Sequence, residues 1–511
     1  MKISIQQLNP KALGFEKNKE LILSKIKESN NDVLNVFPES AISGMPLMSA
    51  IEYEDTYINS ALLCEEICQT NKDIILGTPI KIEDNRFNSI VFFSKGEVIG
   101  LSTKKNLGDF DIGFDSGSGI ETIVYNGKSI GFGFEEDLEE FALLGNRVDI
   151  LIICSNIVFE LDYQQPLYSK LIPIVRKMDT TLIFVNRFGA EGGYLFAGES
   201  FVINKRGEIC SMLPLFEDSS SQIETDNLKL QYQNPLPRME RLYMALVFAL
   251  REYFSKNGIK KAVLGLSGGI DSALVVVIAA SALGKENVVG VLMPSEFSSE
   301  HSIEDALCSA KNLGIEHHIV PIKNSFDVMS SELMTHLPSD FDLAEENLQS
   351  RLRCVTLMWF ANKLCAALLN TTNKSEAAVG YGTLYGDTSG AISVLGDVYK
   401  TEVWELAKWI NRNNELIPYN SIHKAPSAEL RPGQKDSDSL PDYDILDSIL
   451  LEHLENRKGL EEIILETGHP REIVEKVLRL IRINEWKRRQ CPSAVKVTKY
   501  CFGLDRKYPI S

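Results

Sequence analysis

The segment KAVLGLSGGIDSALVVVIAASAL (261–283) decides the fold of the second half of the chain. Residues 262–266 are apolar, as in a buried strand, and they lead into a Ser-Gly-Gly loop. A helix is expected to begin near Asp271 or Ser272. The glycines let backbone N–H groups approach an anion, and the helix N-terminus adds partial positive charge. The segment therefore predicts a strand-loop-helix unit that suits a phosphate or pyrophosphate group.

Asp271 lies in the same loop, where its carboxylate would repel a phosphate unless a cation lay between them. Mg²⁺ is the natural candidate because it binds carboxylate, water and phosphate oxygens. The loop matches neither GxxxxGK[ST] nor GxGxxG, so the two common nucleotide-binding motifs are excluded. The alternative is an ordinary strand-turn-helix in which Asp271 and Ser272 only cap the helix.

The composition of the chain is that of an ordinary soluble globular protein. The chain has 511 residues and a formal net charge of −17, and this length predicts two or three domains. An acidic surface repels polyanions, so no nucleic-acid partner is expected. No signal peptide is visible, and the most apolar helical stretch (273–283) is about half of the ~20 residues that span a bilayer. We therefore expect a cytoplasmic protein with no membrane partner.

The chain divides into three parts by pattern. Residues 1–215 contain many short β-branched runs with amphipathic helices between them, which predicts layered sheets faced by helices. The polar, Ser-rich segment 216–237 ends in Pro and is expected to be a linker. Residues 238–511 alternate long helices, one of them over 346–370, with a few strands, which predicts a doubly wound parallel sheet. The expected strands of this part are 261–266, 287–293, 317–322 and 376–380.

SGGIDS resembles the pyrophosphate loop of the N-type ATP pyrophosphatases, and further motifs narrow the resemblance. These motifs are LMPSEFSSEHSIEDA (292–306), EENLQSRLR (345–353), TTNKSEAAVGYGTLYGDTSG (371–390), DVYKTEVWELA (397–407) and PSAELRPGQKDSDSLPDYDILD (426–447). Together they resemble the synthetase domain of the NAD synthetase family over essentially all of 238–511. The resemblance implies an adenine nucleotide alpha hydrolase-like fold and the ATP-dependent amidation of deamido-NAD to NAD through an acyl-adenylate.

The resemblance also implies roles for individual residues. Catalysis would involve Asp271 and Lys400, and Mg²⁺ would bind Asp271 and Glu376. The residues implied for ATP are Ser267, Gly268, Gly269, Ile270, Asp271, Ser272 and Thr371. Those implied for deamido-NAD are Asn347, Arg351, Glu376, Tyr381, Gly382, Thr383, Leu384 and Lys487. The family's TGNKSE reads TTNKSE here, which puts the local backbone at Thr372 in doubt.

Simpler alternatives stand beside these roles. Lys400 could be a solvated lysine at a helix start, and Lys487 lies in a basic run that is usually surface. Arg351 and Arg353 lie two residues apart on a predicted helix and cannot share one face, so at most one would reach the substrate.

Residues 1–215 resemble, more weakly, the nitrilase superfamily, and this implies an α-β-β-α sandwich and a Glu-Lys-Cys site. The Glu would be Glu39 in VFPES (36–40), and the Lys would be Lys104 in STKKNLGDFDIGFD (102–115). The Cys block reads GFGFEED (131–137), so Glu135 occupies the position of the nucleophile. A carboxylate is a weak nucleophile and would form a mixed anhydride in place of a thioester. The amidase site is therefore predicted to be degenerate.

Other observations agree with a lost amidase. The chain has no histidine before His301, and its nine cysteines form no spaced framework, so neither imidazole-assisted catalysis in the first part nor a zinc site is expected. The family's Gln after VN is Arg187, and its FDG reads FAG at 196–198. We expect Glu135 to form an ion pair with Lys104 and to fill the old pocket. The alternative is that Glu135 points to solvent.

These inferences predict an NAD synthetase that uses free ammonia, or ammonia from a separate glutaminase, and that forms a homo-oligomer. One alternative is a glutamine-dependent synthetase with an unrecognised nucleophile. Another is a non-enzymatic protein that only binds ATP and a dinucleotide. The intact SGGIDS, Asp271 and Glu376 argue against the latter.

Overall fold

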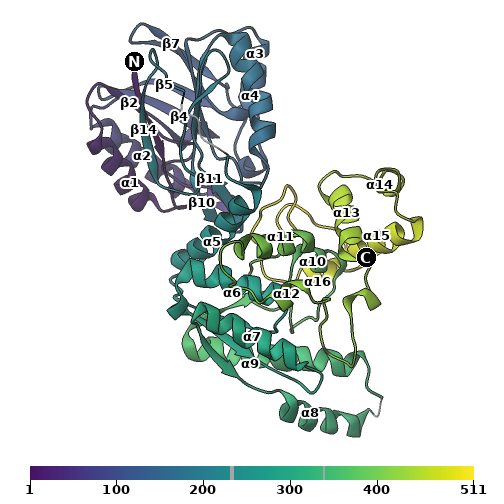
Figure 1. Cartoon of the computed structure of the whole chain (residues 1–511). Coiled ribbons are helices and arrows are strands. Elements are labelled where there is room, and N and C mark those ends of the chain that lie inside the picture. Colours follow the sequence, from purple (N-terminus) through teal and green to yellow (C-terminus); the bar gives the residue numbers. More distant parts are fainter. Residues whose placement is uncertain (231–234, 338–339, 511) are drawn as a thin grey trace. The chain divides into compact units, whose positions relative to one another are not determined.

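The computed structural model describes residues 1–230, 235–337 and 340–510. The chain divides into two compact units, Met1–Pro235 and Leu236–Ser511 (Figure 1). Each unit has its own apolar core, and each is described by itself.

The first unit contains two six-stranded sheets. One sheet has the order β14 (Ser219–Glu224), β1 (Lys2–Gln7), β2 (Val33–Val36), β3 (Ile74–Ile82), β4 (Asn85–Ser94) and β5 (Glu97–Thr103). The other has the order β13 (Ile209–Met212), β12 (Phe201–Ile203), β9 (Thr181–Asn186), β8 (Ile150–Ser155), β7 (Lys128–Gly133) and β6 (Glu121–Tyr125). A two-stranded ribbon, β10 (Phe188–Glu191) with β11 (Tyr194–Ala197), completes the unit.

Three apolar clusters fix the order of the layers. Side chains of the two sheets interdigitate, for example Phe92 of β4 against Phe132 of β7. The outer face of the first sheet packs against α1 (Phe15–Glu28) and α2 (Glu54–Cys68). The outer face of the second packs against α3 (Leu138–Leu143) and α4 (Gln164–Met178). The predicted α-β-β-α sandwich is therefore confirmed.

Part of the expected linker 216–237 is a strand, because residues 219–224 form β14. Its six residues pair antiparallel with β1, from Lys2 opposite Glu224 to Gln7 opposite Ser219. The strand lies at the edge of its sheet, where one face meets solvent, so a polar sequence with one buried apolar side chain, Ile223, is sufficient. Residues 231–234 of the expected linker lie outside the described residues.

The second unit contains a five-stranded parallel sheet. Its order is β17 (Glu316–Ile319), β16 (Val288–Leu292), β15 (Lys261–Gly265), β18 (Ala366–Asn370) and β19 (Ile392–Ser393). The chain moves outward from β15 in one direction and then returns to add β18 on the other side, as in a doubly wound fold. This reversal leaves a crevice beyond the carboxyl ends of β15 and β18, where ligands of such sheets bind.

Some helices of the second unit pack on this sheet, and others form an apolar cluster of their own. Helix α9 (Leu343–Leu364) packs on β15 and β18, while α5 (Arg238–Asn257), α6 (Ile270–Leu283) and α11 (Lys400–Ile410) pack together. The others are α7 (Glu300–Leu313), α8 (Lys323–His336), α10 (Lys374–Val379), α12 (Tyr419–His423), α13 (Tyr443–Leu454), α14 (Leu460–Thr467), α15 (Arg471–Ile483) and α16 (Glu485–Arg488). Helices α10, α13, α14 and α15 share one apolar cluster.

Between residues 346 and 380 the structure confirms the expected long helix but ends it early, and it shows that the expected strand 376–380 is wrong. The long helix ends at Leu364, because Cys365 adopts a left-handed conformation, and 366–370 forms β18. The expected strand 376–380 lies instead in α10 and its cap. Asn373 caps this helix, since its side chain accepts from the Glu376 backbone N–H and Glu376 accepts from the Asn373 N–H. The cap starts a helix in a segment that contains Glu376 and two alanines, which favour helix, and a single β-branched residue, Val379.

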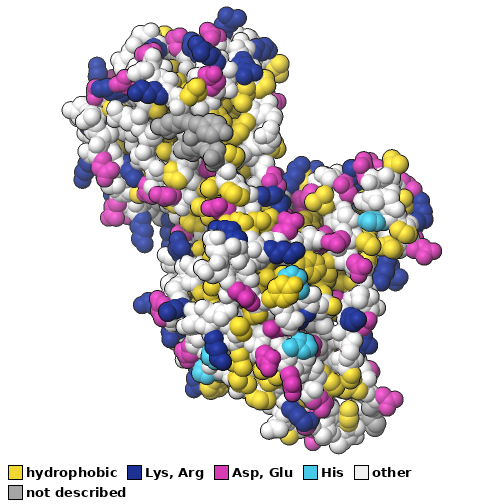
Figure 2. All heavy atoms as spheres, in the orientation of Figure 1, with side chains coloured by type: hydrophobic (Ala, Val, Ile, Leu, Met, Phe, Trp, Pro, Cys, Tyr) yellow, Lys and Arg dark blue, Asp and Glu magenta, His cyan; other side chains and the backbone are white. Residues whose placement is uncertain are grey.

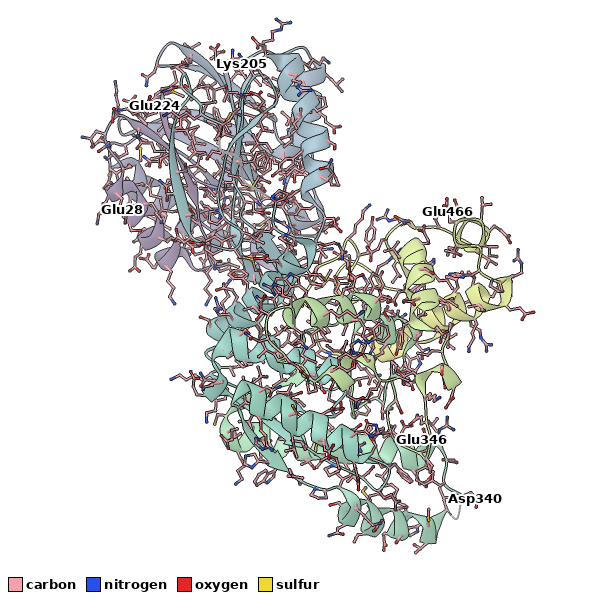
Figure 3. The ribbon with its side chains drawn as sticks, in the orientation of Figure 1. Glu28, Lys205, Glu224, Asp340, Glu346 and Glu466 are labelled. Atoms are coloured by element: carbon pink, nitrogen blue, oxygen red, sulfur yellow. The ribbon has the colours of Figure 1, made fainter. Side chains whose placement is uncertain are left out.

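The surface carries both signs of charge. Figure 2 shows acidic and basic side chains interspersed over the face displayed. Charged side chains such as Glu28, Glu224 and Glu466 project outward from the ribbon (Figure 3). Over the described ranges, no helix is both long and apolar enough to cross a bilayer.

Candidate active site

The Ser-Gly-Gly loop connects β15 to α6 and is closed by its own hydroxyl groups. Ser272 Oγ lies 3.0 Å from Ser267 Oγ and donates to the Gly269 carbonyl at 3.0 Å. Gly268 has φ +76°, and a Cβ atom there would lie 2.1 Å from the Ser302 carbonyl oxygen. Only glycine therefore fits this position. The helix begins at Ile270, at most two residues before the predicted start, and its N-terminus faces the loop.

Three charged side chains meet beside this loop. Lys400 Nζ donates to Asp271 Oδ2 at 2.5 Å and lies 3.5 Å from Glu376 Oε1. The Lys400 side chain is 2% exposed, so the alternative of a solvated lysine is wrong. Burial disfavours its charge, but Asp271 and Glu376 outweigh this and raise its pKa. Burial, reinforced by the charge of Asp271, raises the pKa of Glu376 to about 8.

The NKSE motif holds this group in place. Asn373 Nδ2 donates to Asp271 Oδ1 at 3.0 Å, and Lys374, which is fully buried, forms an ion pair with Asp397 at 2.8 Å. Thr372 has no positive φ, and its backbone N–H donates to Asn370. Thr in place of the family's Gly is thus accommodated without strain. The role of Asn373 was missed in the sequence, although its N-x-x-E capping spacing was a usable signal.

A cavity of about 710 Å³ opens beside the three charged side chains. The predicted site residues that line it are Ser267, Gly269, Ile270, Asp271, Ser272, Thr371, Glu376, Tyr381 and Lys400. Asp436 also lines the cavity and was not predicted from the sequence. Its carboxylate accepts from the hydroxyls of Tyr381 at 3.0 Å and Tyr443 at 2.9 Å.

The other residues predicted for deamido-NAD gather around the turn that follows α10: three lie on it, and three from α9 and α16 bond to it. Thr383 Oγ1 donates to Asn347 Oδ1 at 2.7 Å, and Arg351 Nε donates to the Leu384 carbonyl at 3.2 Å. Lys487 Nζ donates to the carbonyl oxygens of Gly380 and Gly382 at 2.9 and 3.0 Å. The structure brings these residues together, but they are not among those that line the 710 Å³ cavity.

Arg353, not Arg351, is the arginine that lines the cavity. Its Nε donates to the Met293 carbonyl at 3.2 Å, and burial lowers its pKa to about 10. Both arginines lie on α9, and their spacing of two residues directs them to different faces, as the sequence suggested. Periodicity alone could not show which of the two faces the sheet's crevice.

The oxygen donors beside the loop fit Mg²⁺. Asp271 and Glu376 repel each other, and a divalent cation between them would relieve that repulsion. In the described part of the chain, no group of three or more His, Cys, Asp or Glu side chains could hold a metal ion. Two carboxylates are nevertheless enough for Mg²⁺, which takes its remaining ligands from water and substrate phosphates.

In the first unit, Lys104 lies at the centre of a buried acidic group. Its Nζ donates to Glu136 at 2.7 Å and Glu39 at 3.2 Å, and it lies 3.0 Å from Asp111. The side chains of Lys104, Glu39 and Asp111 are no more than 4% exposed. Burial raises the pKa of Glu39 to about 8, against the opposing effect of Lys104. The predicted pair Glu39 and Lys104 is therefore brought together, with Asp111 as an additional member.

The expected ion pair between Glu135 and Lys104 is wrong. Glu135 Oε1 instead accepts from Lys170 Nζ of α4 at 2.6 Å, and the Glu135 side chain is 16% exposed, so it does not point to solvent either. Residues 135–137 form a 3₁₀ turn, in which successive side chains point about 120° apart. Glu136 therefore takes the contact with Lys104. Asp137 accepts from the backbone N–H groups of residues 105 and 106.

The cysteines of the first unit have no activated thiol. Burial raises the pKa of all four, Cys64, Cys68, Cys154 and Cys210, and for Cys64 it reaches about 12. Only a thiolate attacks an amide efficiently, so these side chains are poorly suited to act as nucleophile. The buried guanidinium of Arg187 donates to the carbonyl oxygens of Met45 and Pro10, both at 2.9 Å.

The sequence and structure were compared with known proteins. The NAD synthase family profile matches residues 242–491. A glutamine-dependent NAD(+) synthetase from a Synechocystis strain is 37% identical, over 100% of this chain and 98% of its own. One from Aquifex aeolicus is 35% identical, over 100% and 99%. The solved glutamine-dependent NAD+ synthetase from Acinetobacter baumannii, in complex with ADP, has a TM-score of 0.79 and 32% identity, and the match covers 100% of this chain and 98% of that one.

Proposed function

The chain belongs to the NAD synthetase family, and we propose that it amidates deamido-NAD with ammonia rather than with nitrogen from its own hydrolysis of glutamine. Membership of the family makes it a ligase that forms a carbon–nitrogen bond. The choice of nitrogen donor is supported by one observation, the ion pair of Glu135 with Lys170, at the residue where the nitrilase resemblance expects the nucleophile.

The synthetase unit would act in two steps. A nicotinate carboxylate oxygen attacks the α-phosphorus of ATP, and pyrophosphate leaves with the electrons of the broken P–O bond. Ammonia then attacks the acyl carbon, loses a proton, and displaces AMP. Lys400 and the N–H groups at the start of α6 would neutralise phosphate charge as it develops. Mg²⁺ held by Asp271 and Glu376 would supply further charge neutralisation on the phosphates.

The nucleotide part of the proposal has independent support. The related synthetase from Acinetobacter baumannii was solved with ADP. In this chain the cavity reaches the Ser-Gly-Gly loop and Thr371, where the family resemblance expects ATP. Gly268 leaves room for the close approach of the loop to α7.

The acidic group in the first unit agrees with ammonia as the donor. An amidase would use Lys104 to stabilise an oxyanion, but here three carboxylates surround that ammonium group. Glu39 has no thiol at residue 135 from which to take a proton.

A second candidate is glutamine-dependent synthesis. It is favoured by the names of the relatives, which are glutamine-dependent enzymes over the full length of the chain. In that case the nucleophile would lie elsewhere than residue 135.

A donor assay separates the two candidates. The purified full chain receives deamido-NAD, ATP and Mg²⁺, with either ammonium chloride or ammonia-free glutamine, and both NAD and glutamate are measured. We expect NAD with ammonium, and neither NAD nor glutamate with glutamine. Asp271→Asn is the control that should abolish NAD formation with either donor. Equal rates with glutamine, with one glutamate released per NAD, would refute the proposal in favour of the second candidate.

A further inference from the structure

Asp271 is flanked by Glu376 and Lys400. These two side chains belong to the first turns of two different helices. Glu376 lies in the first turn of α10, and Lys400 is the first residue of α11. The two turns are joined directly, because the Lys400 backbone N–H donates to Ser375 Oγ at 2.9 Å. The distance between Glu376 and Lys400 therefore depends on how these two turns are held together.

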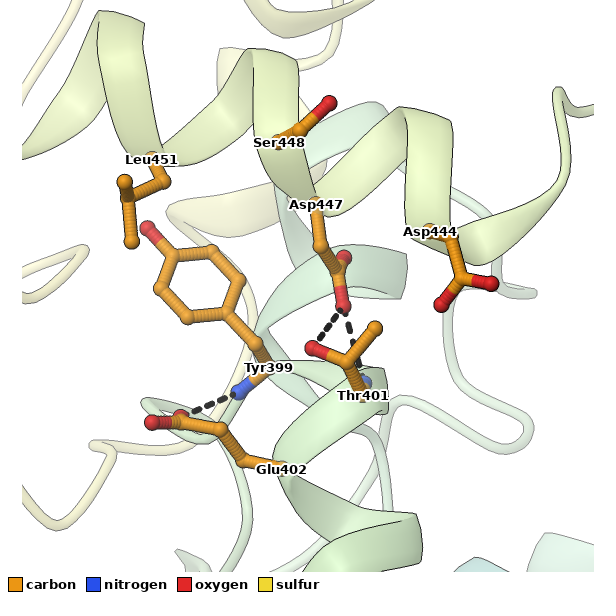
Figure 4. Close-up of a pocket in the computed structure, with 7 residues that line it drawn as sticks. All are labelled: Tyr399, Thr401, Glu402, Asp444, Asp447, Ser448 and Leu451. Carbon is orange, nitrogen blue, oxygen red and sulfur yellow. Dashed lines mark hydrogen bonds between the residues drawn. The ribbon is translucent and has the colours of Figure 1, made fainter.

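A third helix, α13, bonds to both turns through one carboxylate. Ser375 Oγ donates to Asp447 Oδ1. The backbone N–H and the hydroxyl of Thr401 both donate to Asp447 Oδ2 at 2.9 Å (Figure 4). Asp447 is only 6% exposed, and Tyr399, the residue before α11, supplies no side-chain cap. A carboxylate at this place stabilises helix N-termini, whose N–H groups lack partners within the helix.

The same helix also supports the far end of Lys400. Tyr443 lies four residues before Asp447, on the same face of α13. Lys400 Nζ is 5.3 Å from the centroid of the Tyr443 ring, and the Tyr443 hydroxyl holds Asp436 in the wall of the cavity. Helix α13 therefore contacts the backbone of Thr401 through Asp447 and the ammonium group of Lys400 through Tyr443.

We propose that Asp447 is a positioning residue of the synthetase reaction: it fixes the first turns of α10 and α11 against each other and so sets the separation of Glu376 and Lys400. The inference rests on the roles given above to these two residues. Asp447 itself faces a separate small pocket of about 260 Å³, with Asp444, Glu402 and Leu451 in its wall, and so acts from outside the reacting cavity (Figure 4).

The principal variant is Asp447→Asn, which keeps the size of the side chain. It replaces one carboxylate oxygen by an NH₂ group, which cannot accept the hydrogen bonds that Ser375 and Thr401 donate. A displacement of about 1 Å in a reacting group can cost about 100-fold in rate, so we expect kcat to fall about 10- to 100-fold. The KM for ATP should change less than kcat, because the effect falls on the transition state rather than on ground-state binding. The matched control is Asp444→Asn, the same exchange one turn earlier at an exposed residue of the same pocket.

Ser375→Ala breaks the same link from the other side and tests the connection itself. If Asp447 acts through Ser375, the double variant should lose no more kcat than the more damaging single variant. Rates are measured with ammonium per folded protein, with circular dichroism used to confirm folding at the assay temperature. If Asp447→Asn does not fold, Ser375→Ala alone is decisive, and an unchanged kcat overturns the proposal.

Two further outcomes would overturn it: a kcat for Asp447→Asn equal to that of Asp444→Asn, or independent, multiplicative losses from Asp447→Asn and Ser375→Ala. A wild-type protein that forms no NAD from ammonium would contradict the proposed function instead, so the two failures can be told apart.

Discussion

Replacing Lys104 by methionine tests whether this lysine neutralises the buried acidic group of the first unit and so stabilises its fold. Lys104 lies within 3.2 Å of carboxylate oxygens from Glu39, Asp111 and Glu136. The methionine side chain has a similar length but carries no charge. The variant would therefore leave the buried carboxylates of Glu39 and Asp111, which are 3% and 1% exposed, without their cation.

The expected cost follows from this burial. Removing one partner of a buried ion pair costs about 3–5 kcal/mol, because the remaining charge is uncompensated. For a unit of 235 residues, about 2–4 °C of Tm is lost per kcal/mol, so the transition of this unit should fall by about 6–20 °C. Calorimetry of the full chain at pH 9, above the pKa of about 8 of Glu39, measures this shift, and urea unfolding gives the free energy.

The neighbouring residue supplies the control. Lys105 also pairs with a carboxylate, Glu140, but both side chains are at least 40% exposed, so Lys105→Met should change stability little. Adding Glu39→Gln to Lys104→Met should restore part of the loss, because it removes one uncompensated carboxyl while an oxygen remains for Asn88. Equal Tm values for the two lysine variants would refute the idea that Lys104 neutralises a buried acidic group.

Three other predictions concern single residues. Burial raises the pKa of Glu39 from 4.5 to about 8, so its contribution to stability is complete below pH 4.5 and is lost as the pH rises through 8. Urea midpoints should therefore fall as the pH rises from 4.5 to about 8 and then level off, and Glu39→Gln should remove that part of the fall. Lys400→Met should lower kcat with ammonium by about 100-fold or more while the protein stays folded, since the proposed role of the side chain is to neutralise phosphate charge; a change confined to KM would contradict this role. Gly268→Ala should abolish ATP binding measured by calorimetry, because a Cβ would lie 2.1 Å from the Ser302 carbonyl oxygen; normal binding would show that the loop can move away.

Local patterns predicted the regular parts of the fold well. The strand 262–266 and the loop after it lie where the sequence placed them, and the helix begins at Ile270 rather than at 271 or 272. The errors in the predicted secondary structure lie where single residues end or start a helix. Cys365 ends α9 before the apolar residues that form β18, and the Asn373 cap makes a helix of a segment that resembled a strand.

Only part of the candidate site could be predicted from the sequence, because sequence motifs identify residues but not their distant contacts. Asp271, Glu376 and Lys400 could be proposed from their motifs, because a family motif preserves residue types at fixed spacing. Which side chains they touch depends on distant segments: Asp447 lies 46 residues beyond Thr401, and Tyr443 approaches Lys400 from another helix. No local pattern encodes those contacts, since they arise only when α10, α11 and α13 pack around one core.

The GFGFEED stretch (131–137) shows which features follow from the residue order and which depend on the folded structure. The order of residues alone places a carboxylate at residue 135, where the nitrilase resemblance expects the nucleophile, because this order is set before the chain folds. The ion pairs of Glu135 with Lys170 and of Glu136 with Lys104 become visible only in the folded structure. The cause is geometric: a 3₁₀ turn rotates successive side chains by about 120°, and the packing of α4 on the sheet decides which cation each carboxylate meets.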